Sequence, residues 1–289
     1  MYSPDFDYFR ARSIHDAQQM LASHPGAKLL AGGHSLIPLM KLRLAAPSAV
    51  IDIGRIPELR GISTADGIIR IGALTTHAEL AGSADLQHGA AALAEAAAQV
   101  GDPAVRNRGT IGGNVAHADP ASDLPIVLVA LGGQLVVVGP RGERTINAAD
   151  FFTGIMTTAI GEDEILAAVQ VPAAKSGQGS AYAKFSHPAS RYAVIGSAAL
   201  ITVNGGACSA VSAAIGGLVT HARRLKSVEA KLMGQQISDT SVAAAVAEVS
   251  TDLSDVMGDI YASAEYRREV APVYVKRALQ EAAARAARS

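Results

Sequence analysis

The stretches Ala31-Gly32-Gly33-His34-Ser35 and Thr110-Ile111-Gly112-Gly113-Asn114 decide the fold of this chain. Each interrupts apolar sequence and is followed by an expected helix start. Adjacent glycines lack Cβ atoms, so their main-chain N–H groups can press closely against a large polar ligand. Two such segments with similar small polar flanks predict one ligand held from both sides, most simply a dinucleotide.

The sequence around the first glycine pair predicts an α/β unit. Ser13-Ile14-His15-Asp16 resembles a capping box that opens a helix ending before Pro25-Gly26. Strands are expected at 28–30 and 50–53, and Ser35 can cap a short helix between them. This β–turn–α–β order suits a unit that binds its ligand at the carboxyl edge of the strands.

The rest of the chain predicts two further units. Turn signals and apolar periodicity indicate these elements: strands at 68–72, 135–138, 144–146, 165–171, 194–203 and 207–215, and helices at 76–80, 90–100, 124–131, 222–233, 242–249 and 265–284. The small, polar stretch 175–180 is expected to be a linker. The predicted class is α+β, with two N-terminal α/β subdomains (1–55 and 56–175) and a C-terminal α+β domain (176–289) that combines an antiparallel sheet with helices.

Composition excludes several classes of protein. The 289 residues carry 25 Lys and Arg against 26 Asp and Glu, and no basic stripe with interleaved aromatics, so no nucleic-acid partner is expected. The single cysteine, Cys208, cannot form an internal disulfide or hold an iron–sulfur cluster, and it is expected to fill space in the core. No signal peptide and no transmembrane segment are predicted, which favours a cytoplasmic protein.

The common nucleotide-binding motifs are missing. The Rossmann hexad G-x-G-x-x-G is absent at both sites because the glycines are adjacent, and the P-loop pattern G-x-x-x-x-G-K-[ST] is absent as well. NAD or ATP enzymes of those folds are therefore disfavoured.

Extended to Ala31–Pro38 and combined with Thr110–Asn114, the two segments resemble the FAD-binding medium subunit of molybdenum hydroxylases, a family that includes xanthine and carbon monoxide dehydrogenases. The resemblance covers essentially the whole chain. It implies a PCMH-type FAD-binding fold, with FAD between the two N-terminal subdomains and its isoalloxazine reaching toward the C-terminal domain.

The resemblance also implies which residues hold FAD. One side of the diphosphate would meet the backbone of Gly32, Gly33, His34 and Ser35, and the other side would meet Thr110, Gly112, Gly113 and Asn114. Their neighbours Ala31, Leu36 and Ile111 complete the two segments. The alternative is that each glycine pair is only a tight turn.

Four further positions match the family. The resemblance implies that Asp123 hydrogen-bonds the ribityl hydroxyls, although Asp123 could instead cap the following helix. Leu166 and Lys184 would lie beside the flavin ring, where a cation stabilises the reduced flavin; Lys184 could instead be an exposed strand lysine. Tyr192 would stack over or gate the isoalloxazine, or it could be a core tyrosine.

Other candidate groups are weaker. His117, Asp119 and Asp123 could be imagined as metal ligands, but they lack the further ligands that a closed site needs, so no metal is expected. Arg106 and Arg108 could meet an anion, a partner protein or solvent. No nucleophile elbow occurs.

The predicted function is that of an electron-transfer flavoprotein subunit. By the resemblance, substrate would be oxidised at a molybdopterin cofactor in a large partner chain. Electrons would pass through [2Fe-2S] clusters of a small chain to FAD here, and then to NAD, a quinone or dioxygen. A dimer of heterotrimers, at most peripheral to the inner membrane, is the family expectation. The alternatives are a stand-alone flavin oxidase or reductase, and a scaffold that has lost flavin.

Overall fold

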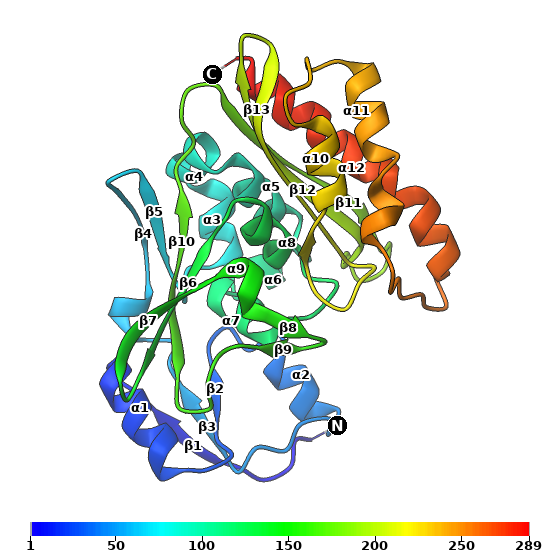
Figure 1. Cartoon of the computed structure of the whole chain (residues 1–289). Helices are drawn as coiled ribbons and strands as arrows, with labels where there is room; N and C mark the ends of the chain where they lie inside the picture. Colours follow the sequence, from blue (N-terminus) through cyan, green and yellow to red (C-terminus); the bar gives the residue numbers. More distant parts are fainter. Residues whose placement is uncertain (1, 289) are drawn as a thin grey trace.

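A three-stranded parallel sheet forms the N-terminal part of the chain in the computed structural model, which describes residues 2–288. The strand order is β1-β3-β2, and this unit lies at the bottom of the molecule in Figure 1. The side chain of Ser13 accepts a hydrogen bond from the Asp16 N–H, which confirms the predicted helix start. The elements are β1 (Asp7–Arg10), α1 (Ile14–Ser23), β2 (Lys28–Leu30), α2 (Leu36–Lys41) and β3 (Ala49–Asp52).

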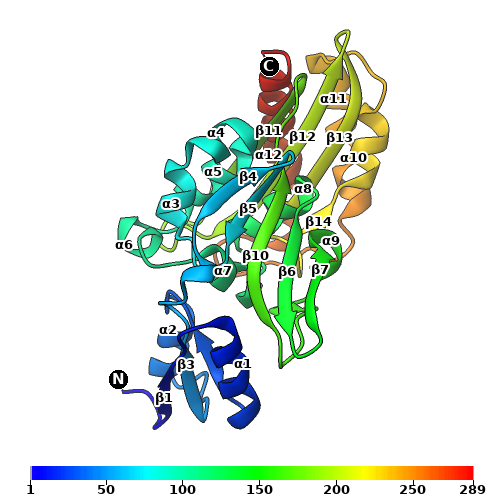
Figure 2. The same ribbon diagram turned by 90° about the vertical axis from the view of Figure 1, so that its left-hand side faces the viewer.

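A five-stranded antiparallel sheet, ordered β4-β5-β10-β6-β7, forms the middle of the molecule. Figure 2 shows this sheet above the N-terminal unit, with helices against one side. The elements are the 3₁₀ turn η1 (Pro57–Leu59), β4 (Ile62–Ala65), β5 (Ile68–Gly72), α3 (His77–Gly82), α4 (Ala84–Gly89), α5 (Ala91–Gln99), α6 (Pro103–Arg106), α7 (Ile111–His117), α8 (Asp123–Ala130), β6 (Gln134–Gly139), β7 (Gly142–Asn147), α9 (Ala148–Phe151), the β8 (Phe152–Gly154) and β9 (Thr157–Thr158) hairpin, and β10 (Ile165–Pro172).

The C-terminal part is a four-stranded antiparallel sheet, β11-β12-β13-β14, with helices along it. Helix α8 packs against this sheet at two glycines. A Cβ added to Gly196 would lie 2.5 Å from the Ile126 side chain, and one added to Gly216 would lie 2.6 Å from it. The elements are β11 (Gln178–Ser186), β12 (Ala193–Asn204), β13 (Ala207–Gly216), β14 (Arg223–Arg224), α10 (Lys226–Leu232), α11 (Asp239–Val246), the 3₁₀ turn η2 (Val249–Asp252) and α12 (Ala264–Ala286).

Three sequence predictions need correction. The expected linker 175–180 ends in strand β11, where Gly179 is present because α12 lies so close: a Cβ would be 2.2 Å from the Ala282 carbonyl oxygen. The helix predicted to begin at residue 222 begins at Lys226, after the short strand β14. The second glycine pair lies in the first turn of α7, whereas the helix was expected to start after it.

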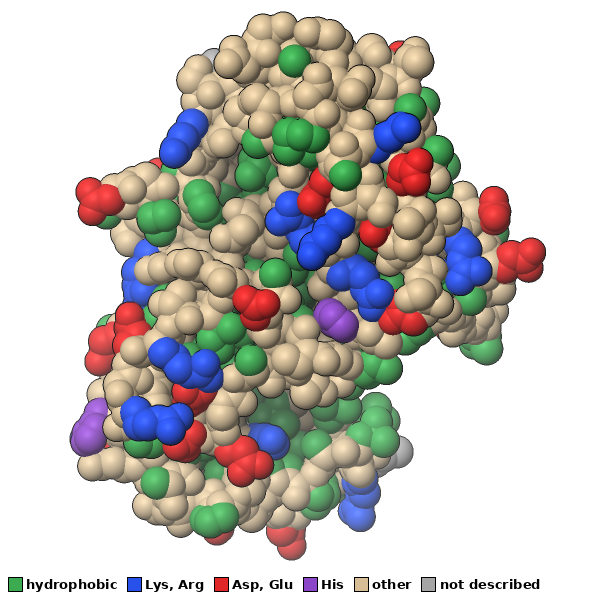
Figure 3. Space-filling view, viewed as in Figure 1, with side chains coloured by type: hydrophobic (Ala, Val, Ile, Leu, Met, Phe, Trp, Pro, Cys, Tyr) green, Lys and Arg blue, Asp and Glu red, His purple; other side chains and the backbone are tan. Residues whose placement is uncertain are grey.

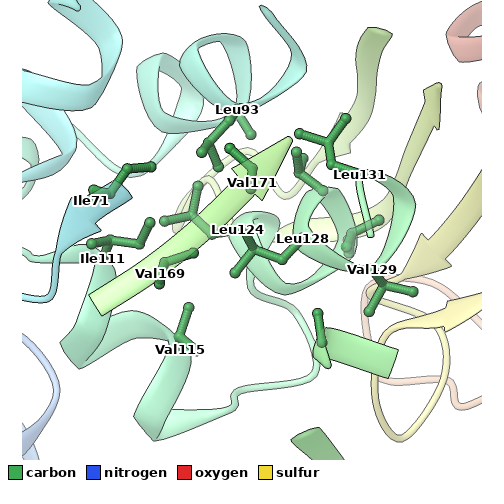
Figure 4. Close-up of a cluster of buried hydrophobic side chains, with 14 of the residues drawn as sticks. Ile71, Leu93, Ile111, Val115, Leu124, Leu128, Val129, Leu131, Val169 and Val171 are labelled. Carbon is green, nitrogen blue, oxygen red and sulfur yellow. The ribbon is translucent and has the colours of Figure 1, made fainter. Parts of the chain in front are cut away.

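Apolar residues gather in three buried clusters. The largest joins the five-stranded sheet to α5, α7 and α8, and Figure 4 shows Ile111, Val115 and Leu124 in it. Cys208 is fully buried in the cluster of the C-terminal part, as predicted. The α+β class is confirmed, whereas the boundaries at 55 and 175 stay predictions. None of the helices formed by residues 2–288 has both the length and the hydropathy needed to span a bilayer.

Candidate functional site

A cavity of about 720 Å³ lies where the three parts of the chain meet. In Figure 3 the surface is hollowed between the N-terminal unit and the part above it, and hydrophobic side chains are visible inside. Most of the predicted site residues line this cavity: Ala31, Gly32, Gly33, His34, Ser35, Leu36, Thr110, Gly112, Gly113, Asn114, Asp123, Leu166 and Tyr192. The side chain of Ile111 lies in the core instead (Figure 4), and Lys184 does not line the cavity.

The first glycine pair presents a row of unused donors to the cavity. Within the described chain, the main-chain N–H groups of Gly32, Gly33, His34 and Ser35 donate no hydrogen bond. Gly33 has a φ of +78°, a conformation that strongly favours glycine. Consecutive N–H groups at such a turn form a concave site for an anion. This segment therefore fits the diphosphate of a dinucleotide.

The second glycine pair has a different role. The N–H of Gly112 donates to the Ala73 carbonyl oxygen at 2.8 Å, and that of Gly113 donates to Thr110 Oγ1 at 3.1 Å. A Cβ on Gly112 would lie 2.5 Å from the Cβ of Ala73. Both N–H groups of the second pair are therefore already used within the chain: that of Gly112 fixes α7 against Ala73, and that of Gly113 caps the start of α7. That the first pair holds the ligand through its N–H groups stays a prediction.

Glycines also let the two segments meet. A Cβ on Gly32 would lie 2.1 Å from the Arg108 carbonyl oxygen, and one on Gly113 would lie 3.9 Å from the Cβ of Ala31. Any side chain at residue 32 would therefore push the segments apart. This close contact at Gly32 keeps the two segments together where both of them line the cavity.

Asp123 is part of a buried polar triad. Its carboxylate lies 2.9 Å from Lys184 Nζ and accepts a 2.5 Å hydrogen bond from the Tyr182 hydroxyl. Lys184 also donates to the carbonyl oxygen of Gln99, the last residue of α5. Burial raises the pKa of Asp123, and the charge of Lys184 opposes that rise. Burial and the neighbouring carboxylate raise the pKa of Tyr182.

The triad excludes two alternatives that the sequence left open, one for Lys184 and one for Asp123. Lys184 is no exposed strand lysine, because its side chain is 0% exposed. Asp123 is no helix cap: the N-cap of α8 is Ser122, and the Asp123 carboxylate binds side chains of β11. Sequence reasoning missed Tyr182, although it lies two residues before Lys184 and so faces the same side of its strand.

Leu166 and Tyr192 line the cavity from the other two parts of the chain. Tyr192 follows the β11–β12 turn and is 45% exposed, so the core-tyrosine alternative is wrong. Thr158 of β9 and Ile160 also line the cavity. Neither was found from the sequence, since the short hairpin β8–β9 has no strong strand pattern.

His77 is a further residue that sequence reasoning missed. It lines the cavity, is 3% exposed, and its Nδ1 has no hydrogen-bond partner among the described residues. Burial, helped by nearby His34 and Arg106, lowers the pKa of His77 to about 4. The imidazole is therefore neutral at pH 7.

Of the remaining candidates, His117 lines this cavity, whereas Arg106 and Arg108 do not. Arg106 donates to the carbonyl oxygens of Val100 and Gly101, which gives it a structural role. Arg108 lines a smaller neighbouring cavity. Among residues 2–288, no three His, Cys, Asp or Glu side chains lie close enough together to hold a metal ion.

Family models match both halves of the chain. Residues 4–174 match the FAD-binding domain of molybdopterin dehydrogenases, in agreement with a cavity whose donor row fits a dinucleotide diphosphate. Residues 180–282 match the carbon monoxide dehydrogenase flavoprotein C-terminal domain. The chain belongs to the family of FAD-binding medium subunits of molybdenum hydroxylases.

Individual relatives align along the full length. The chain is 39% identical to the carbon monoxide dehydrogenase medium chain of Hydrogenophaga pseudoflava, over 99% of this chain and 100% of that one. It is 36% identical to the nicotine 6-hydroxylase medium subunit of Paenarthrobacter nicotinovorans, with 99% and 100% covered.

Solved structures agree with these relationships. A carbon monoxide dehydrogenase structure from Hydrogenophaga pseudoflava superposes with a TM-score of 0.95 at 40% identity, covering 99% of each chain. Quinoline 2-oxidoreductase from Pseudomonas putida 86 superposes with a TM-score of 0.93 at 31% identity, again over 99% of each chain.

Proposed function

We propose that this subunit holds FAD in the 720 Å³ cavity and passes electrons from [2Fe-2S] clusters of a small partner subunit to an external acceptor. The observation that carries the proposal is the row of four unused N–H donors at Gly32–Ser35. Such a row binds a diphosphate without any positive side chain. FAD, when bound, supplies the ability to take up and release one or two electrons.

The chain's own residues have separate tasks in this proposal. Gly32, Gly33, His34 and Ser35 bind the diphosphate through their N–H groups. Thr110 and Asn114 approach the same group from α7, while Asp123 faces the ribityl chain and Leu166 packs beside the ring. Lys184 acts through Asp123, whose carboxylate it holds in place. Tyr192, which lines the cavity and is 45% exposed, stacks over the isoalloxazine or gates it.

The proposal extends to the complex. Substrate oxidation takes place at a molybdopterin cofactor in a large subunit, and the complex is a cytoplasmic dimer of heterotrimers. The acceptor is NAD, a quinone or dioxygen. The lone, buried Cys208 supports the need for a partner, because one thiol cannot hold an iron–sulfur cluster.

Copurification tests this function. The chain is isolated alone and with its native partners, and flavin, iron and molybdenum are quantified in each. We expect yellow protein in both, with substrate-dependent bleaching of the flavin only when iron and molybdenum are present. Substrate turnover by the isolated yellow chain would instead establish a stand-alone enzyme, and a colourless chain that ignores added FAD would refute the flavin site.

A further inference from the structure

A second cavity, of about 330 Å³, lies beside the flavin cavity. It is lined at the carboxyl ends of all three N-terminal strands, by Arg10 of β1, Leu30 of β2 and Asp52 of β3. Gly32 and Thr110 line both cavities. The carboxyl edge of a parallel sheet is where α/β units commonly bind ligands.

Arginine dominates this second cavity. Four arginines line it, namely Arg10, Arg55, Arg60 and Arg108, against a single carboxylate, that of Asp52. Asp52 is already occupied, because it accepts hydrogen bonds from the Tyr8 hydroxyl at 2.6 Å and from the Gly54 N–H at 2.8 Å, and it lies 3.4 Å from Arg10 Nε. The cavity therefore has a large excess of positive charge.

Two of these guanidinium groups are unused. The side chains of Arg55 and Arg108 form no hydrogen bond or ion pair with any residue from 2 to 288, whereas Arg60 donates to the Gly54 carbonyl oxygen at 2.7 Å. Like charges gathered without partners repel one another, so an arrangement of this kind is stabilised by an anion. Guanidinium groups match the geometry of phosphate with paired hydrogen bonds.

We infer that the arginine cavity binds a phosphate-bearing small molecule at a site separate from the flavin. Its volume lies at the lower end of the range for ligand pockets. Several guanidinium groups together suit a ligand with a dianionic phosphate better than a ligand with a single carboxylate. The phosphate can be free or part of a mononucleotide, and both use the same arginines.

Calorimetric titration of the FAD-loaded complex tests the inference. Inorganic phosphate and AMP are titrated separately at low ionic strength, and the tighter of the two shows whether a nucleoside contributes. We expect saturable binding that weakens at least about 10-fold, or 1.4 kcal/mol, in the double variant Arg55→Gln, Arg108→Gln. Arg268→Gln, which removes an exposed arginine of α12, is the matched control and should leave binding unchanged.

Several results would overturn the inference. Absence of saturable binding, or equal affinity in the double variant, removes the site. Binding seen only without FAD would mean that phosphate occupies the place of the flavin diphosphate. Binding by the isolated chain that disappears in the complex would mean that a partner side chain fills the cavity. The flavin-to-protein ratio of Arg55→Gln reports separately on the fold and the flavin site.

Discussion

Replacing Lys184 with methionine should destabilise the protein strongly, because it leaves the Asp123 carboxylate buried without its counter-charge. The Lys184 side chain is 0% exposed and the Asp123 side chain is 5% exposed, so water cannot compensate. Breaking a buried ion pair from one side costs about 3–5 kcal/mol. The hydrogen bond to the Gln99 carbonyl oxygen is lost as well.

Urea unfolding of the full chain, followed by circular dichroism because the chain has no tryptophan, measures this loss. With a slope of about 1–3 kcal/mol/M, the midpoint should fall by at least about 1 M. Lys231→Met, at an exposed position of α10, is the control and should change stability by less than about 0.5 kcal/mol.

The double variant Lys184→Met, Asp123→Asn separates charge from packing. Asparagine still accepts a hydrogen bond from Tyr182 but carries no charge, so the double variant should be more stable than Lys184→Met alone. If Lys184→Met unfolds at the wild-type midpoint, or if the double variant loses the sum of both single losses, the account of the buried pair is refuted.

Three further changes test other parts of the site. Gly32→Ala should weaken FAD binding by at least about 10-fold, because its Cβ would lie 2.1 Å from the Arg108 carbonyl oxygen. Flavin absorbance per protein measures this loss. The control Gly82→Ala, where a Cβ meets nothing within 4 Å, should retain FAD, and equal retention in both variants would contradict the packing argument. His77 has a pKa of about 4 in the folded state against 6.5 normally, owing to burial first and then to His34 and Arg106, so the unfolded chain binds more protons between these values and stability falls as pH drops through that window. From pH 7 to 4.5 this group should remove about 2–3 kcal/mol, and His77→Gln should show a smaller loss; equal losses would show that His77 is not held neutral. Tyr192→Ala should leave the fold intact, because Tyr192 is 45% exposed, but should increase quenching of flavin fluorescence by iodide, and unchanged quenching would remove its covering role.

Local signals predicted much of the fold. Capping by Ser13 and the alternation in 165–171 and 194–203 give elements that the structure confirms, because each depends on neighbours in sequence. Strands β1 and β4 were not found. Both are short, and mostly exposed residues form them, so no apolar alternation marks them.

Glycine was the hardest residue to interpret from sequence. Gly179 was assigned to a linker, and Gly112 to a segment that offers N–H groups to a ligand. Both are glycine because another part of the chain lies within contact distance: α12 at Gly179 and Ala73 at Gly112. Such contacts join residues far apart in sequence, and composition alone cannot separate close packing from flexibility.

The candidate site, like the fold, was predicted only where the signal is local in sequence or comes from the family resemblance. The two motifs predicted that Gly32 and Gly113 meet at one site, and both line the same cavity. This prediction was possible because a family resemblance carries three-dimensional information. Sequence could not show which N–H groups were already used, nor that Tyr182 and Lys184 share Asp123. These facts depend on how three separate sheets meet.

Amide hydrogen exchange at single-residue resolution, with and without FAD, tests the central claim most directly. The N–H groups of Gly32, Gly33, His34 and Ser35 should exchange rapidly in the FAD-free chain and become protected when FAD binds, while those of Gly112 and Gly113 should be protected in both states. Protection that appears at Gly112 and Gly113 on FAD binding, with no change from Gly32 to Ser35, would contradict the account.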